Sequence, residues 1–171
     1  GVDWVAVSTA HAPTPRFNHR LSYDPLRGRV VLFGGCDSLS VLGLCNGVTL
    51  GDTWEYDGVD WFQMTPADAP AARSGHGMAW DASRGAVVLF GGRTLGGAQA
   101  DLWAYQGVTW SALSVSSGPP ARSGHAMAFD ARAQRLVVQG GCAVFRDGPA
   151  PCVGAAFEDT WALSGSVWTE L

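Results

Sequence analysis

The sequence contains no lysine, few charges and no long apolar run. All 11 basic side chains are arginines, and charged residues make up only 15% of the chain, whereas about a quarter is usual. The formal net charge is −4, and the arginines form no basic stripe. We therefore expect no nucleic-acid partner. Because no run of about 18 apolar residues is present, we also expect no membrane span.

Helical periodicity is missing as well. No segment repeats its apolar residues every 3.6 positions or so, which predicts essentially no helix. The chain has instead 23 glycines and 8 tryptophans among its 171 residues. A chain rich in glycine and aromatic residues but poor in charge is typical of short strands joined by tight turns. We therefore predict an all-β fold.

Three sets of markers recur in the same order along the chain. Each set has an arginine three residues before a histidine, a Gly-Gly pair after an apolar run, an Asp-x-Trp motif and a later tryptophan that follows a glycine by three residues. The members are Arg16, His19, Gly34-Gly35, Asp52-Thr53-Trp54 and Trp61; Arg73, His76, Gly91-Gly92, Asp101-Leu102-Trp103 and Trp110; and Arg122, His125, Gly140-Gly141, Asp159-Thr160-Trp161 and Trp168. Equivalent markers are roughly 50 residues apart, which is the length of a four-stranded propeller blade.

The Gly-Gly pair after an apolar strand, followed by the two tryptophans, resembles the kelch repeat. The segment 122–130, Arg-Ser-Gly-His-Ala-Met-Ala-Phe-Asp, is similar to secreted bacterial kelch and galactose-oxidase-type propellers. The resemblance covers nearly the whole chain and implies a β-propeller with three kelch-type blades in one segment, 1–171. We expect the blades at approximately 12–64, 69–113 and 118–171, with an extra fourth strand at 1–7.

Three blades leave two apolar faces uncovered, because a propeller ring usually needs about four to eight blades. One expectation is a homodimer in which each copy supplies half of a six-bladed ring. The other is that the chain is part of a longer propeller. Residues 1–4, Gly-Val-Asp-Trp, copy residues 58–61 and predict a fourth strand without the rest of its blade, which favours the second expectation. Because a stable chain must cover these faces, we nevertheless expect self-association that completes a ring.

All four cysteines lie in the two longest connections between a Gly-Gly pair and an Asp-x-Trp motif. Within each connection a cysteine opens the inserted residues and a second cysteine closes them, which predicts the disulfides Cys36–Cys45 and Cys142–Cys152. A zinc site is the alternative, but no Cys-x-x-Cys spacing or flanking histidine supports it. Paired cysteines indicate an oxidising compartment, so we expect a secreted, periplasmic or cell-surface protein.

The repeated arginines and histidines are the most conspicuous polar set. The candidate ligand-binding residues are Arg16, Arg73, Arg122, His19, His76 and His125. The arginines could surround a channel mouth and attract an anion such as a carboxylate. Because the set recurs once per repeat, we favour a structural role, in which each pair ties its blade to the next through backbone carbonyls. The aspartates of the Asp-x-Trp motifs are expected to cap turns.

We therefore expect a non-catalytic scaffold that binds protein or carbohydrate through loops on one rim, above all the two cysteine-bounded loops. We expect no catalytic residues, metal or cofactor, because the chain lacks a nucleophile elbow, a phosphate loop and metal-ligand spacing. The alternatives are a kelch-class enzyme acting on a sugar, similar to a mutarotase, and a purely architectural half-ring. An enzyme would need a non-repeated acid or base, for which Glu55, Glu158 and Asp147 are the candidates.

Overall fold

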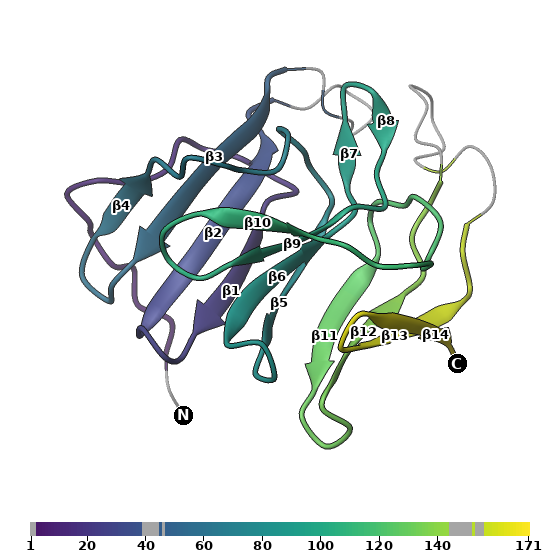
Figure 1. Cartoon of the computed structure of the whole chain (residues 1–171). Helices are drawn as coiled ribbons and strands as arrows, with labels where there is room; N and C mark the ends of the chain where they lie inside the picture. The colour runs from purple at the N-terminus through teal and green to yellow at the C-terminus, as the bar shows by residue number, and fades with distance from the viewer. Residues whose placement is uncertain (1–2, 39–44, 46, 144–151, 153–155) are drawn as a thin grey trace.

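The computed structural model describes residues 3–38, 45, 47–143, 152 and 156–171. These residues form three four-stranded antiparallel sheets and one two-stranded hairpin, and they contain no helix (Figure 1). We call the sheets blades 1, 2 and 3. Blade 1 contains β1 (Arg20–Asp24), β2 (Arg29–Cys36), β3 (Thr49–Tyr56) and β4 (Trp61–Met64); blade 2 contains β5 (Gly77–Asp81), β6 (Ala86–Phe90), β9 (Leu102–Tyr105) and β10 (Trp110–Leu113); blade 3 contains β11 (Ala126–Asp130), β12 (Arg135–Gln139), β13 (Thr160–Ser164) and β14 (Val167–Glu170). The prediction of an all-β fold built of kelch-like sheets is confirmed.

Within each blade the strands follow one another in space as they do in sequence. The first strands of the three blades lie together, with β5 between β1 and β11, while β4, β10 and β14 form the far edges (Figure 1). The short hairpin of β7 (Arg93–Thr94) and β8 (Gly97–Ala98) interrupts the connection between β6 and β9. It rises at the top of the view in Figure 1, at the edge where β2 ends and β3 begins.

The predicted extra strand at 1–7 stays a prediction. Residues 3–7 form no strand, and Trp4, Val5 and Val7 are exposed. A fourth strand pairs with the third strand of its own blade, as β4 does with β3. For a fourth strand that precedes blade 1, no such third strand is present among the described residues.

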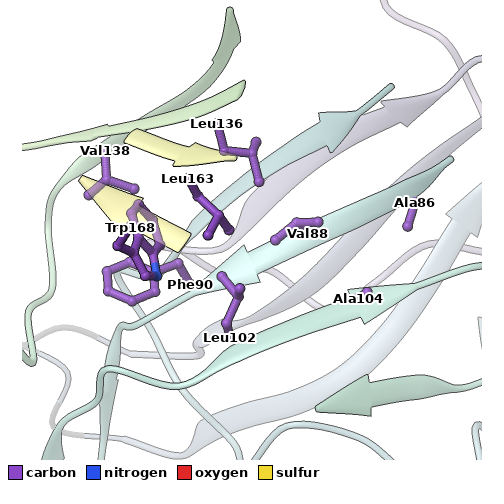
Figure 2. Close-up of a cluster of buried hydrophobic side chains, with 9 residues drawn as sticks. All are labelled: Ala86, Val88, Phe90, Leu102, Ala104, Leu136, Val138, Leu163 and Trp168. Atoms are coloured by element: carbon purple, nitrogen blue, oxygen red, sulfur yellow. The ribbon is translucent and has the colours of Figure 1, made fainter. Parts of the chain in front are cut away.

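The central strand of blade 2 is buried on both faces, because a neighbouring blade covers each face. All five residues of β6 are buried. Val87 and Leu89 pack toward blade 1, whereas Ala86, Val88 and Phe90 pack toward blade 3. Figure 2 shows the second cluster, in which these three residues meet Leu102, Ala104, Leu136, Val138, Leu163 and Trp168. The core is therefore two layers between blades rather than one central core.

Two disulfides, Cys36–Cys45 and Cys142–Cys152, join residues nine and ten positions apart. Both predicted pairings are thus confirmed. Cys36 is the last residue of β2 and is completely buried. Most of each cysteine-bounded loop, including residues 39–44 and 144–151, lies outside the described residues.

A buried polar contact joins blades 1 and 2. The Tyr105 hydroxyl donates to Glu55 at 2.9 Å, and Arg27 donates to the same carboxylate oxygen at 2.7 Å. Burial, together with the nearby Glu55 carboxylate, raises the pKa of Tyr105 well above its usual range. The tyrosine therefore remains a donor, and the Glu55 charge is satisfied within the interface.

Replacing Tyr105 by phenylalanine should lower the free energy of unfolding by about 2 kcal/mol, because a buried hydrogen bond to a charged group is lost. The matched control is Tyr56→Phe, at the equivalent position of blade 1, where the hydroxyl makes no hydrogen bond within the described residues. Urea unfolding of both variants measures the difference. Equal losses would show that the Glu55 contact does not stabilise the blade 1–blade 2 interface.

Candidate functional site

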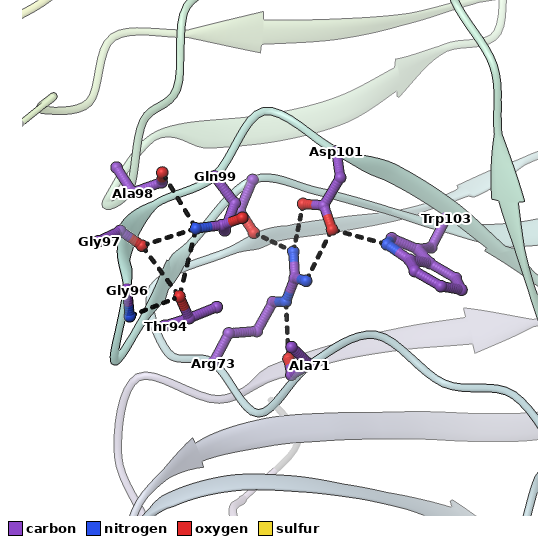
Figure 3. A network of polar contacts seen from close by, with 10 residues as sticks. Ala71, Arg73, Thr94, Gly96, Gly97, Ala98, Gln99, Asp101 and Trp103 are labelled. Atoms are coloured by element: carbon purple, nitrogen blue, oxygen red, sulfur yellow. Dashed lines mark hydrogen bonds and ion pairs between the residues drawn. The ribbon is translucent and has the colours of Figure 1, made fainter.

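Each blade carries a cluster of one buried arginine, one partly exposed aspartate and one partly buried tryptophan. In blade 2, both terminal nitrogens of Arg73 donate hydrogen bonds to the Asp101 carboxylate, at 2.5 and 2.7 Å (Figure 3). Trp103 Nε1 donates a third hydrogen bond to the same aspartate at 2.7 Å. The Arg73 Nε–H donates to the carbonyl of Ala71, and Nη1 also donates to the carbonyl of Gly91, both at 2.9 Å. The carboxylate thus meets a bidentate guanidinium and an indole N–H at once.

The same cluster recurs in the other two blades with nearly the same distances. Arg16 binds Asp52 at 2.6 and 2.9 Å, and Arg122 binds Asp159 at 2.6 and 2.7 Å. Trp54 and Trp161 donate to these aspartates at 2.6 and 2.7 Å. The three arginine side chains are at most 3% exposed. Their N–H groups are therefore directed into their own blades rather than toward solvent.

The charge pairing controls the ionisation of the aspartates. Burial alone would raise the pKa of Asp52 and Asp101, but hydrogen bonds from the arginine and the tryptophan outweigh it and lower both values. For Asp159, the hydrogen bond from Arg122 is the largest cause of a lowered pKa. The aspartates stay ionised at neutral pH. Their main partners are side chains rather than the turn N–H groups that the sequence led us to expect.

The backbones of Arg73 and Arg122 each tie their blade to the previous one. Gly35 N–H donates to the Arg73 carbonyl at 2.9 Å, and Arg73 N–H donates to the Leu50 carbonyl at 3.0 Å. Gly34 and Gly35 have φ of 63° and 104°, which favours glycine. A Cβ on Gly34 would lie 2.5 Å from the Arg73 carbonyl oxygen. The Gly-Gly pair therefore lets the next blade approach closely.

Two of the three histidines of the repeat, His76 and His125, lie in the layer between neighbouring blades. His76 packs edge-on against Phe33 with ring centres 5.6 Å apart, and His125 packs against Phe90 at 5.4 Å. Both residues are almost completely buried. Burial, reinforced by nearby arginine charges, lowers the pKa of His76 well below its usual value and that of His125 to about 4. Both imidazoles are therefore neutral at pH 7.

The six candidate ligand-binding residues thus occupy three equivalent positions, with one arginine and one histidine per blade, and each arginine is paired with the aspartate of its own blade. Their interactions within the described residues are internal to the blades and their joints. Their role toward a ligand stays a prediction.

Two polar features were missed by the sequence reasoning. The first is the contact of Arg27 and Tyr105 with Glu55. The second is a small cleft of about 90 Å³ beside the β7–β8 hairpin. It is lined by Cys45, Gly47, Thr49, Ser74, Arg93, Thr94 and Leu95. Arg93 breaks the repeat and forms no ion pair within the described part of the chain, and this irregularity was the available signal.

The buried histidines should make the fold sensitive to mild acid. In the unfolded chain His125 has an ordinary pKa near 6.5, so the unfolded state binds more protons as the pH falls from there toward about 4. Stability present above pH 6.5 is therefore lost through this window, and His125 alone should account for about 2 kcal/mol between pH 7 and pH 5.

This slope can be measured by urea unfolding across the pH range. His125→Gln should lose less stability than the wild type on acidification, because the variant has one titrating group fewer. Ser123→Ala, a change at a buried neighbour, is the control and should keep the wild-type slope. An unchanged slope in His125→Gln would contradict the assignment.

Two further searches bear on the chemistry of the site. The described residues contain no group of three or more histidine, cysteine, aspartate or glutamate side chains arranged to hold a metal ion. They also contain no helix with the length and apolarity that a membrane span requires. Both ring nitrogens of His76 and of His125 are buried without a hydrogen-bond partner among the described residues.

Comparison with known families gives one result that covers the chain. The family model described as the KLHDC2/KLHL20/DRC7 Kelch-repeats domain matches residues 3–171. No curated protein matches the chain. The bacterial subfamily suggested by the sequence stays a prediction. Since the match spans almost every residue and the sheets have the four-stranded form of kelch blades, the chain belongs to the kelch-repeat family.

Proposed function

We propose that the chain is a non-catalytic kelch scaffold that binds a protein or carbohydrate partner at one rim of its blades. The observation that carries this proposal is the irregularity of that rim on an otherwise regular frame. Two of the three connections from the second to the third blade strand contain a disulfide, and the remaining one contains the β7–β8 hairpin. Variable connections on a rigid frame are where binding residues concentrate.

The lining of the cleft beside the β7–β8 hairpin is suited to a ligand that has polar groups and an apolar part. Its lining includes the guanidinium of Arg93 and the side chains of Thr49, Ser74 and Thr94. Leu95 at the tip of the hairpin is 96% exposed. Hydroxyl groups and a guanidinium can bind sugar hydroxyls or peptide carbonyls, and an exposed leucine adds apolar contact.

A catalytic alternative receives less support from the geometry. Of the candidate acids, Glu55 is buried and holds the Tyr105 hydroxyl and the Arg27 guanidinium. Glu158 is exposed, and Asp147 lies outside the described residues. A sugar mutarotase-like enzyme would require an acid or base with access to substrate, and the buried Glu55 carboxylate lacks that access.

The disulfides are compatible with an oxidising location, and we propose a secreted, periplasmic or cell-surface protein on that ground. We further propose that the two uncovered blade faces are closed by additional blades. Leu21 and Tyr23 on the outer face of blade 1 are 49% and 56% exposed. Contiguous apolar exposure of this kind is typical of an interaction surface.

Binding at the rim can be tested with immobilised panels of oligosaccharides and secreted proteins. The double variant Arg93→Ala, Leu95→Ser should lower binding of a specific ligand at least tenfold, because it removes the cleft cation and the hairpin tip. The control is Val59→Ser with Val108→Ser, two exposed positions on the turns before β4 and β10. Equal binding by both double variants would contradict a rim site. Catalysed anomerisation of a sugar by the wild type would favour the enzyme alternative.

A further inference from the structure

We propose that blade 1 of one copy packs on blade 3 of a second copy through the same contacts that join the blades inside the chain. This proposal rests on the proposed closure of the free blade faces, and it commits to a second copy as the occupant. The contact would be head-to-tail, because it joins two different surfaces, the free face of blade 1 and the free face of blade 3.

The internal joints share a set of three backbone hydrogen bonds. Between blades 1 and 2, the donors Gly35, Arg73 and Gly75 bind the carbonyls of Arg73, Leu50 and Asn18 at 2.9, 3.0 and 2.9 Å. Between blades 2 and 3, the donors Gly92, Arg122 and Gly124 bind the carbonyls of Arg122, Gln99 and Gly75 at 2.9, 3.0 and 2.7 Å. The pattern is thus a property of the joint and not of one blade.

The outer sides of blade 3 and blade 1 carry the donors and acceptors of a third such set of backbone hydrogen bonds. Blade 3 presents the N–H of Gly141 and the carbonyls of Phe157 and Gly124, which correspond to the groups that blade 1 offers to blade 2. The segment before β1 presents the carbonyl of Arg16 and the N–H groups of Arg16 and Asn18. None of these six groups has a backbone partner within the described residues. Each donor on one side therefore has an acceptor at the matching place on the other.

A side-chain pair repeats the same correspondence. At the blade 1–blade 2 joint, the buried Trp110 donates from Nε1 to the Thr53 hydroxyl at 3.0 Å. Trp61 occupies the position of Trp110 in blade 1, because each pairs with a tyrosine of the preceding strand. Thr160 occupies the position of Thr53, directly after the aspartate of the Asp-x-Trp motif. Neither the Trp61 indole nor the Thr160 hydroxyl forms a hydrogen bond among the described residues.

The two free faces also complement each other in size. Blade 1 exposes Leu21 and Tyr23, together with a groove of about 480 Å³ that Trp54 and Trp61 line. Across the strand pairs of blade 3, the free face carries the small or polar side chains of Ala126, Ala128, Val137, Gln139, Ala162 and Thr169. Large side chains already face small ones at the blade 2–blade 3 joint, where Met127 and Phe129 pack with Ala79.

A contact between two different faces closes into a ring only if its rotation allows closure; otherwise it builds a filament. Two chains with three blades each would give six blades, a number within the usual range of about four to eight. The ring would contain two identical joints. Light scattering on a sizing column should therefore give a mass of about twice 17.9 kDa.

Two charge insertions test the head-to-tail arrangement. Tyr23→Arg places a charge on the free face of blade 1, and Ala128→Arg places one on the free face of blade 3. Each variant alone should have the mass of a single chain, because both joints of its ring are damaged. An equimolar mixture should recover the double mass, because the mixed pair keeps one joint with two native faces.

The controls separate this joint from the broader proposal. Val108→Arg, on the 80% exposed position before β10, should keep the double mass, and circular dichroism should show that all variants remain folded. A single-chain wild type would overturn both self-association and the joint. A double-mass wild type that is insensitive to either variant, or a mixture that stays single-chain, would overturn the joint alone.

The Trp61–Thr160 pair provides a finer test. Trp61→Phe and Thr160→Val should each weaken association by roughly tenfold to a hundredfold, because each removes one hydrogen bond from both joints of the ring. The double variant should be little weaker than either single variant if the two groups bind each other. Fully multiplied effects would contradict this contact. Sedimentation velocity over a concentration series gives the dissociation constants.

Discussion

The fold depends on the ion pair between the buried cluster arginine and the partly exposed aspartate of the Asp-x-Trp motif. A guanidinium taken from water is costly unless a carboxylate and carbonyls satisfy its donors, and in blade 2 Arg73 has both. Because the aspartate also accepts the indole N–H of Trp103, one carboxylate fixes the arginine, the third strand and a core aromatic ring. The arginine backbone then contacts the previous blade, so a single residue links the inside of a blade with its joint.

The joints use the same backbone contacts but different side chains, which shows how far the repeat can vary. At the blade 1–blade 2 joint, Trp110 binds the Thr53 hydroxyl. At the blade 2–blade 3 joint, Leu102 stands at the position of Thr53, and the Nε1 of Trp168 has no partner within the described residues. The second joint is correspondingly apolar. Backbone bonds and close packing therefore define the joint, and polar side chains adjust its strength.

Much of the periodic structure could be predicted from the sequence, because each marker recurs at the equivalent position of all three blades. The recurring markers predict the four-stranded blades, and the positions of the cysteines predict the disulfides. The contact of Glu55 with Arg27 and Tyr105 could not be predicted. Its partners are 28 and 50 residues away, and blades 2 and 3 have alanine at the position of Glu55. No repetition marks such a contact, so only the packing of one blade on another shows it.

The same reasoning separates structural from functional residues in this fold. A side chain that recurs in every blade and is buried with its partners, as Arg73 is, contributes to the frame whatever the ligand. A residue that departs from the repeat and lacks a partner has no such explanation. Arg93 meets this condition at the rim cleft. Trp61 and Thr160 belong to the repeat, but within the described residues they form no hydrogen bond like the one between Trp110 and Thr53. Binding is therefore best sought at the rim, and assembly at the faces, because the cluster arginines and aspartates are already paired with each other inside the blades.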